Sequence, residues 1–323
     1  MTPQHLKYLL TLAEELNFSK AAQKLFITQP SLSQYVRNLE AQLNVPLFDR
    51  STAPIRLTPA GRIYIDAARR IQAIHAELDN QLADLHNLDI GELRIGTTPF
   101  RASCLLPKSI GAFRQKHPGV NIRIVEEKET ELESLLADGH LDLCILAGPL
   151  NESLFHSEPL AEETLYLAVP PASSFHNGRE DRQLFSEDIM TNSRRLFRAP
   201  PVDLSHCTRE SFIFLQQDKH FRLLEQELSH LPDFSPEIVL HTESIETSFA
   251  WTLSGIAFCC IPDTFIRFGN QERHPVYYKL DSPSAKRDIV VAFKKNRYLS
   301  RAASKYVLIL RQLIGQGTWE PPG

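Results

Sequence analysis

The sequence has little of what marks a secreted or membrane protein. It has only five cysteines, an odd and scattered number, so we expect no disulfide framework and a reducing cytoplasm. No apolar run approaches membrane-spanning length, and the longest, Ile256 to Ile261, suits a buried strand. Because Glu14 and Glu15 interrupt the apolar residues near the N-terminus, we also expect no signal peptide.

Motifs of common enzymes and metal sites are missing as well. The sequence contains no Gly-x-Ser-x-Gly elbow, no phosphate loop with Gly-Lys-Thr and no His-Glu-x-x-His pair. Its twelve histidines show no spacing typical of metal ligands. We therefore expect no catalytic residue, metal or cofactor, and an enzyme or a pure solute-binding protein is the less favoured alternative.

The most informative stretch, Phe18 to Leu43, is expected to form two helices joined by a tight turn. Ser19 is placed to cap the first helix and Thr28 the second. At 100° per residue the second helix has one apolar stripe and an opposite polar face with small residues and one guanidinium. Such a face suits base edges in a major groove. The stripe comprises Leu32, Val36, Leu39 and Leu43, and the polar face Pro30, Ser31, Ser33, Gln34, Arg37 and Asn38.

An ordinary helical hairpin with a solvated face would show the same spacing, but two further features favour DNA binding. Val45–Arg50 and Ile55–Thr58 read as two short strands around a Ser-Thr-Ala-Pro turn, which would form a wing beside the helices. Residues 1–62 hold seven basic and four acidic side chains, a net charge of +3, in a chain whose total is −4. The remainder therefore carries −7, and a basic head on an acidic body is expected of phosphate binding.

These residues closely resemble the winged helix-turn-helix of LysR-type transcriptional regulators. The resemblance rests on Phe18-Ser19, Ala21-Ala22, Leu25, Gln29-Pro30-Ser31-Leu32-Ser33, Leu39-Glu40, Leu47-Phe48-Asp49-Arg50 and Leu57-Thr58-Pro59-Ala60-Gly61. The chain departs from the family at Gln34, where most members have a basic residue, so its base preference there is open to difference. The expected contacts to a double-stranded, inverted-repeat operator are Ser19, Thr28, Gln29, Pro30, Ser31, Ser33, Gln34, Arg37, Arg50 and Arg56.

After the wing, Thr58 can cap a long helix running to about Leu88. Its apolar residues follow a heptad pattern, which favours pairing with a second copy over packing on its own domain. The family resemblance implies the same, as a homodimer or homotetramer. The expected dimerisation residues are Ile71, Ile74, Leu78, Leu82 and Leu85.

From Gly91 onward, strands alternate with helices, which indicates a doubly wound α/β unit, and the pattern then recurs. The predicted strands are Leu93–Gly96, Val120–Val125, Leu141–Leu146, Thr164–Val169, Ser211–Leu215, Ile238–His241, Gly255–Ile261 and Asp288–Phe293, and a helix over Ser300–Ile314 closes the chain.

Two such units in series resemble the LysR-type effector domain, which is similar to a two-lobed periplasmic solute-binding protein. The expected α/β architecture is then a winged helix-turn-helix (1–58), a linker helix (59–89) and an effector domain (90–323). Because the resemblance implies two crossings of the chain, lobe I would span about 90–163 and 268–323, and lobe II about 164–267. Residues Phe175 to Pro200 look like an insertion relative to the family, without an assigned role.

Ligands of open α/β sheets collect at the carboxyl ends of strands, where helix N-termini attract anions. The threonines there would serve equally well as ordinary helix caps, and Arg101 as a solvated surface arginine. The expected effector is a small anionic metabolite, a carboxylate, between the lobes, and because the body is net acidic a neutral or cationic ligand is the alternative. Its expected contacts are Thr97, Thr98, Pro99, Arg101, Thr130, Gly148, Gln216, Gln217 and Thr247.

Thiol-based redox sensing is an alternative to effector binding. Cys207 is placed in a loop with His206 and Arg209 near it, although no resolving cysteine follows within a few residues. Cys144, Cys259, Cys260 and Cys104 are expected in the core. The sequence thus predicts a cytoplasmic, effector-controlled transcriptional regulator, and the resemblance allows RNA polymerase as a further partner.

Overall fold

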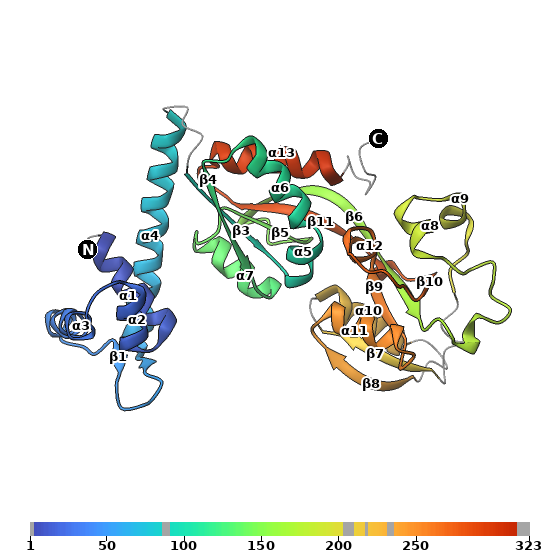
Figure 1. Cartoon of the computed structure of the whole chain (residues 1–323), viewed down its shortest axis with the longest axis horizontal. Helices are drawn as coiled ribbons and strands as arrows, with labels where there is room; N and C mark the ends of the chain where they lie inside the picture. Colours follow the sequence, from blue (N-terminus) through green and yellow to red (C-terminus); the bar gives the residue numbers. More distant parts are fainter. Residues whose placement is uncertain (1–2, 86–90, 203–209, 217–218, 231–235, 315–323) are drawn as a thin grey trace. The chain divides into compact units, whose positions relative to one another are not determined.

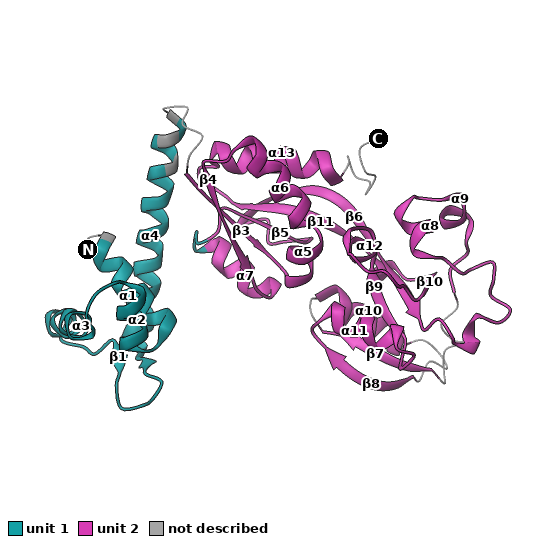
Figure 2. Ribbon diagram, in the orientation of Figure 1, with its two compact units in different colours: residues 1–86, 138–140 teal, residues 87–137, 141–323 magenta. Residues whose placement is uncertain are grey.

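A computed structural model describes residues 3–85, 91–202, 210–216, 219–230 and 236–314. The chain divides into two compact units, residues 1–86 with 138–140 and residues 87–137 with 141–323 (Figures 1 and 2). Within the described ranges, no helix combines the length and the apolar character that crossing a membrane would require.

The first unit packs three short helices and a two-stranded wing on one long helix. Its elements are α1 (Pro3–Glu15), α2 (Phe18–Lys24), α3 (Gln29–Leu43), β1 (Phe48–Asp49), β2 (Arg56–Leu57) and α4 (Pro59–Leu85). Leu32 and Val36 of α3 are fully buried in a core with Ala21 and Ala22, whose small side chains let α2 and α3 approach closely. The predicted helix pair and wing are confirmed. Leu43, at the end of the predicted stripe, is 37% exposed and does not belong to the core.

The caps of α2 and α3 test the sequence reading in detail. The prediction that Ser19 caps α2 is wrong, because Asn17 Oδ1 accepts hydrogen bonds from the Ser19 and Lys20 amides. Ser19 is already inside the first turn. The prediction for α3 is confirmed: Thr28 has extended backbone angles and its side chain accepts from the Ser31 amide at 3.3 Å.

Helix α4 begins where the sequence places it, since Thr58 Oγ1 accepts from the Gly61 amide at 2.9 Å. Three of its predicted seam residues are exposed in the single chain, Ile74 by 67%, Leu78 by 50% and Leu82 by 47%. Ile71 packs partly against the core of the first unit. The Leu85 side chain and residue Leu88 lie outside the described residues.

The second unit is built on one mixed, curled sheet. Its first part runs in the order β4-β3-β5-β11-β6, with α5, α6, α7 and α13 around it (Figure 1). The strands are β3 (Gly91–Thr97), β4 (Val120–Glu126), β5 (Leu143–Ala147), β6 (Phe155–Val169) and β11 (Lys286–Lys294). The helices are α5 (Pro99–Cys104), α6 (Leu106–Lys116), α7 (Glu129–Ala137) and α13 (Arg301–Ile314).

The second part of the sheet uses the end of β6. There β6 pairs with β9 (Cys259–Pro262) and β10 (Val276–Lys279). A parallel pair, β7 (Ser211–Leu215) and β8 (Glu237–Thr242), joins β9 through hydrogen bonds between Phe258 and residues Ser211 and Ile213. The helices of this part are α10 (Lys219–Ser229), α11 (Ile245–Leu253) and α12 (Asp263–Phe268), and a 3-10 turn, η3 (Pro283–Ala285), precedes β11.

Strand β6 differs most from the prediction made from the sequence. The sequence predicts only its last six residues, but it is one strand of 15 residues, so the expected lobe boundary at 163/164 falls inside it. Pro159 and three acidic residues, Glu158, Glu162 and Glu163, hide its first half in the sequence. The register of β6 against β11 shifts between Ile289 and Val290, beside Pro159, and such an irregularity accommodates a proline in a sheet. Because β6 and β11 pair antiparallel, the sheet is mixed, which helix–strand alternation does not predict.

The segment from Phe175 to Pro200 is a folded addition at the edge of β10. It contains η1 (Ser174–His176), α8 (Ser186–Met190) and α9 (Arg194–Arg198), and Leu184 forms a bridge to Tyr277. Leu184 and Ile189 are fully buried. The segment therefore extends the effector-domain core.

Candidate functional site

The outward face of α3 is the first candidate site. Gln29, Pro30, Ser31, Gln34 and Arg37 are exposed, and Ser33 is partly exposed. This polar face lies opposite Leu32 and Val36, which anchor the helix in the core. Helix and core thus present the predicted groups together on one side.

The polar side chains of α3 differ in whether they already form hydrogen bonds within the protein. The hydroxyls of Thr28 and Ser31 lie 2.8 Å apart, and Gln34 Nε2 donates to Asn38 Oδ1 at 2.8 Å. Arg37 has no hydrogen bond or ion pair recorded among the described residues. Its guanidinium can therefore meet a base or a phosphate without breaking an internal contact.

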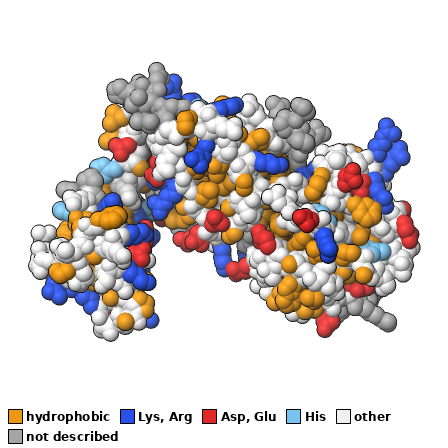
Figure 3. Space-filling view, viewed as in Figure 1, with side chains coloured by type: hydrophobic (Ala, Val, Ile, Leu, Met, Phe, Trp, Pro, Cys, Tyr) orange, Lys and Arg blue, Asp and Glu red, His pale blue; other side chains and the backbone are white. Residues whose placement is uncertain are grey.

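The wing is tied to α3 by Glu40. Its Oε1 accepts from the Leu47 and Phe48 amides at 2.8 and 3.0 Å, and its Oε2 from Arg50 at 2.7 Å. Arg50 thus has a structural ion pair, whereas Arg56 of β2 and Ser19 of α2 are exposed. On the face seen in Figure 3, basic side chains are more frequent than acidic ones on the first unit.

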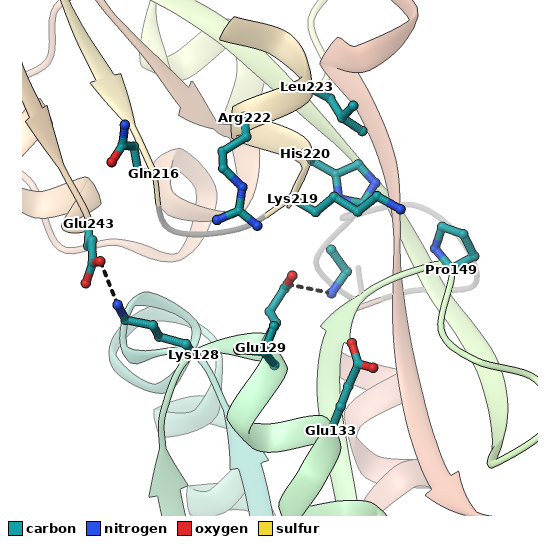
Figure 4. Close-up of a pocket in the computed structure, with 12 residues that line it drawn as sticks. Lys128, Glu129, Glu133, Pro149, Gln216, Lys219, His220, Arg222, Leu223 and Glu243 are labelled. Atoms are coloured by element: carbon teal, nitrogen blue, oxygen red, sulfur yellow. Dashed lines mark hydrogen bonds and ion pairs between the residues drawn. The ribbon is translucent and has the colours of Figure 1, made fainter. Parts of the chain in front are cut away.

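The second candidate site is a cleft of about 460 Å³ in the effector domain (Figure 4). One wall comes from the start of α7 and the end of β5, and the other from α10 and the ends of β7 and β8. These are carboxyl ends of strands, where ligands of α/β sheets collect. The lining residues are Lys128, Glu129, Thr130, Glu133, Ala147, Pro149, Gln216, Lys219, His220, Arg222, Leu223 and Glu243.

Charged groups dominate both walls of the cleft. Lys128 Nζ and Glu243 Oε1 form an ion pair at 2.6 Å across it. Glu129 Oε1 accepts from the Ala147 amide at 3.3 Å. Burial raises the pKa of Glu133 above its ordinary value, and the charge of Lys219 opposes this shift. The cleft therefore offers both carboxylates and cations to a ligand.

Of the eight predicted effector residues that the structure describes, two line this cleft, Thr130 and Gln216. Thr97 is fully buried and donates to the Ile145 carbonyl at 2.8 Å, and the fully buried Thr98 accepts from Arg101 at 3.3 Å. Pro99, Gly148 and Thr247 are not among the lining residues. Gln217 lies outside the described residues. The roles given to these residues stay predictions.

Arg101 belongs to a buried ionic cluster and is not a surface arginine. Its Nη2 lies 3.2 Å from Glu163 Oε2, which also accepts from Arg287 Nε at 2.5 Å. Thr264 donates to the other Glu163 oxygen. Burial alone would raise the pKa of Glu163, but Arg287 and Arg101 hold it below its ordinary value. The cluster joins α5, β6, β11 and α12 where β6 passes between the two parts of the sheet.

Sequence reasoning missed the charged residues of the cleft. It selected the right strand ends but looked there for hydroxyls, whereas the lining is formed by Lys128, Glu129, Glu133, Lys219, Arg222 and Glu243. A usable signal was present, because charges of both signs begin the helices after Val120–Val125 and Ser211–Leu215.

The cysteines of the described residues are all buried: Cys104, Cys144, Cys259 and Cys260. Burial raises the pKa of Cys104 and of Cys259 to about 12, which keeps both as unreactive thiols. Cys207, on which the redox alternative rests, lies outside the described residues.

A winged helix-turn-helix together with a domain that carries a ligand cleft defines a DNA-binding transcription regulator with an effector domain. Residues 3–62 match the model for bacterial regulatory helix-turn-helix proteins of the lysR family, and residues 86–314 the LysR substrate binding domain. The chain belongs to the LysR family of transcriptional regulators.

Relatives and solved structures agree with this assignment. A probable RuBisCO transcriptional regulator of Cyanidioschyzon merolae (strain NIES-3377 / 10D) is 30% identical, over 94% of this chain and 95% of its own length. The uncharacterized HTH-type transcriptional regulator YcgK of Bacillus subtilis (strain 168) is 29% identical over 96% and 94%. Full-length CbnR complexed with its target DNA has the same fold, with a TM-score of 0.65 at 21% identity, covering 96% of this chain and 99% of that one.

Proposed function

We propose that this regulator reads an inverted-repeat operator with α3 and changes its DNA binding when a small metabolite with an anionic group occupies the effector cleft. The observation that carries the proposal is the cleft itself, where Lys219 and Arg222 of α10 face a space suited to a small ligand. Such a role requires binding and no catalysis.

The proposed division of labour follows the expected domains, with DNA reading by 1–58, dimerisation by 59–89 and effector binding by 90–323. The exposed Ile74, Leu78 and Leu82 support pairing of α4 with a second copy, since apolar side chains on a helix gain most from a partner. A twofold dimer, or a tetramer made of two such dimers, would present recognition helices to two half-sites. Because such a regulator would act on chromosomal DNA, we expect a cytoplasmic location. RNA polymerase would then be a further partner.

Effector binding would act as a shift between two arrangements of the domain. A ligand moves such an equilibrium only by its differential affinity for the two states. The cleft is lined from both parts of the sheet, so a ligand that contacts both walls would favour one arrangement of those parts. The pairing helix would then carry the change to the recognition helices.

The test of DNA reading is Arg37→Ala. If Arg37 reads a base, operator affinity should fall by about 1–3 kcal/mol and sequence preference should relax at one position. If it meets only phosphate, binding should weaken evenly across sequences and the salt dependence should shrink. The measurement is fluorescence anisotropy with DNA from upstream of the protein's own coding region, at several salt concentrations.

The matched control is Arg69→Ala, an exposed arginine of α4. It should leave operator affinity within a few tenths of a kcal/mol. Equal affinity, sequence preference and salt dependence in Arg37→Ala and the parent would refute the role of this face.

A further inference from the structure

We propose that the effector is a zwitterion, a small metabolite that carries an ammonium group and a carboxylate, as free amino acids do. The inference rests on the proposed effector function and specifies the chemistry of its ligand. It follows from the separation of charge between the two walls of the cleft.

The wall formed by α7 is acidic and the wall formed by α10 is basic. Figure 4 shows Glu129 and Glu133 rising from α7 toward the space that Arg222 and Lys219 enter from α10. Lys128 and Glu243 already neutralise each other across the rim at 2.6 Å. The charges that remain inside the cleft are the carboxylates of Glu129 and Glu133 on one side and the cations Lys219 and Arg222 on the other.

These four charged side chains differ in how far they already interact with other groups of the protein. Glu129 is held by the Ala147 amide and lies 3.8 Å from Arg101, so it belongs partly to the framework. Glu133 feels the charge of Lys219 across the cleft, but within the described ranges neither of them, nor Arg222, forms a hydrogen bond or a close ion pair. Glu133 is consequently the carboxylate for an ammonium group, and Arg222 and Lys219 are the cations for a carboxylate.

A ligand with one charge would fit this cleft poorly. An anion would satisfy Arg222 and Lys219 but would cover Glu133 and remove its water without offering a partner. A cation would have the reverse effect. A zwitterion pairs with both walls at once, and because it bridges them it also favours one arrangement of the two parts of the sheet.

The remaining lining suits the rest of such a molecule. The cleft volume of about 460 Å³ lies in the range of small-ligand sites. Leu223 and Pro149 offer apolar contact, and Thr130 and Gln216 offer hydrogen bonds. The charged ends would thus set the class of ligand and the other residues its side chain.

The experiment is a thermal-shift screen of the full chain with the twenty L-amino acids, followed by calorimetric titration of those that stabilise it. Each amino acid is compared with the amine that lacks its carboxylate and the acid that lacks its amine. We expect at least one amino acid to bind, and both of its singly charged analogues to bind at least about tenfold more weakly.

Two variants then assign the walls. Glu133→Gln should weaken binding of the amino acid at least about tenfold. It should also reduce the ratio by which the amino acid binds more tightly than the acid that lacks its amine. Arg222→Gln should reduce the ratio by which the amino acid binds more tightly than the amine that lacks its carboxylate. Glu131→Gln, an exposed neighbour on α7, and Arg114→Gln, an exposed arginine of α6, are the matched controls and should bind like the parent.

The outcomes separate the two proposals. If singly charged metabolites, added to the screen, bind as tightly as amino acids and Glu133→Gln has no effect, the zwitterion is refuted while the effector cleft stands. If no compound of any charge class stabilises the protein or alters its operator affinity, both proposals fail.

Discussion

The DNA-binding unit and the effector domain place their charged groups in opposite ways. Among the described residues, the first unit buries no charged side chain, and Thr11 is its one buried polar residue. The effector domain buries five charged ones, Arg94, Arg101, Glu163, Asp263 and Arg287. The first unit keeps nearly all its described polar groups on its surface, which includes the proposed DNA-reading face of α3, whereas the second also uses them inside.

This difference shows how each unit obtains its geometry. The face of α3 needs only a helix with an apolar stripe, so consecutive residues build it and an apolar core suffices. In the effector domain, Glu163 of β6 holds Arg101 of α5 and Arg287 of β11, which lie 62 and 124 residues away in the chain. The cost of desolvation offsets much of what a buried ion pair adds to stability, but removing one partner is costly because it leaves a buried charge poorly compensated.

The largest effect is expected for Glu163→Gln, because it removes the fully buried carboxylate that pairs with both Arg101 and Arg287. Loss of one partner of a buried ion pair should lower the free energy of unfolding of the effector domain by about 3–5 kcal/mol. The neighbouring Glu162→Gln breaks an exposed ion pair with Lys286 and should cost less than about 1 kcal/mol. Chemical denaturation of both variants measures the contrast, and similar losses would show that the buried cluster has no special role.

The next effect tests whether the first unit's exposed apolar side chains are covered in the assembly. Leu78→Lys would place a charge in the proposed α4 seam and should weaken dimerisation at least about 100-fold, or about 2.7 kcal/mol. Gln72→Lys changes an exposed polar position of the same helix and serves as the control. Analytical ultracentrifugation reports the oligomer, and an unchanged oligomer in Leu78→Lys would place the seam elsewhere.

A smaller effect should appear as a pH dependence confined to the effector domain. Burial, and next the charge of Glu163, raise the pKa of Asp263 to about 7, although Arg267 and the Thr164 amide favour its charged form. Because this pKa is higher in the folded state than in the unfolded chain, the stabilising contribution is complete below pH 4 and is lost as pH rises to 7.

Asp263→Asn should remove this dependence. Relative to the variant, the parent should lose about 1–2 kcal/mol of stability between pH 5 and pH 7. Asp281→Asn, at an exposed position, should keep the parent's profile. Thermal unfolding across this pH range measures the difference, and parallel profiles for the parent and Asp263→Asn would contradict the assigned pKa.

The smallest effect concerns the cap of α3. Thr28→Ala removes the acceptor for the Ser31 amide and should cost about 1 kcal/mol of stability in the first unit. Ser19→Ala should cost less than half as much, since Asn17 caps α2. Thermal unfolding of the two variants compares them directly, and an equal loss would mean that Ser19 has a structural role of its own.

The caps also show how far local reasoning reaches. Thr28 and Ser19 both precede or begin apolar helical patterns, and both have side chains able to cap. Asn17 caps α2 in place of Ser19 because it is the last residue before the helix with an extended backbone, with φ −152° and ψ 117°. A single residue can carry a cap, but the position of the turn depends on how α1 and α2 pack.

The effector domain shows where sequence reasoning stops. Its buried strands, such as β5 and β7, are continuous apolar runs and are visible in the sequence. The first half of β6 is not visible in this way, because it contains Pro159 and acidic residues. The register irregularity accommodates Pro159, and the buried ionic cluster accommodates Glu163. Arg101 illustrates the same limit, since its pattern in the sequence fits an exposed arginine and only the approach of β6 and β11 buries it.

The sequence by itself determined the helix pair, the wing, the start of the linker helix, the polar face of α3 and the family, because each depends on residues a few positions apart. Only the tertiary structure decided which charges face one another in the cleft and which are sealed inside the sheet. Those contacts join residues up to 124 positions apart, and their energy depends on burial and pairing, which a local pattern of residue types does not contain.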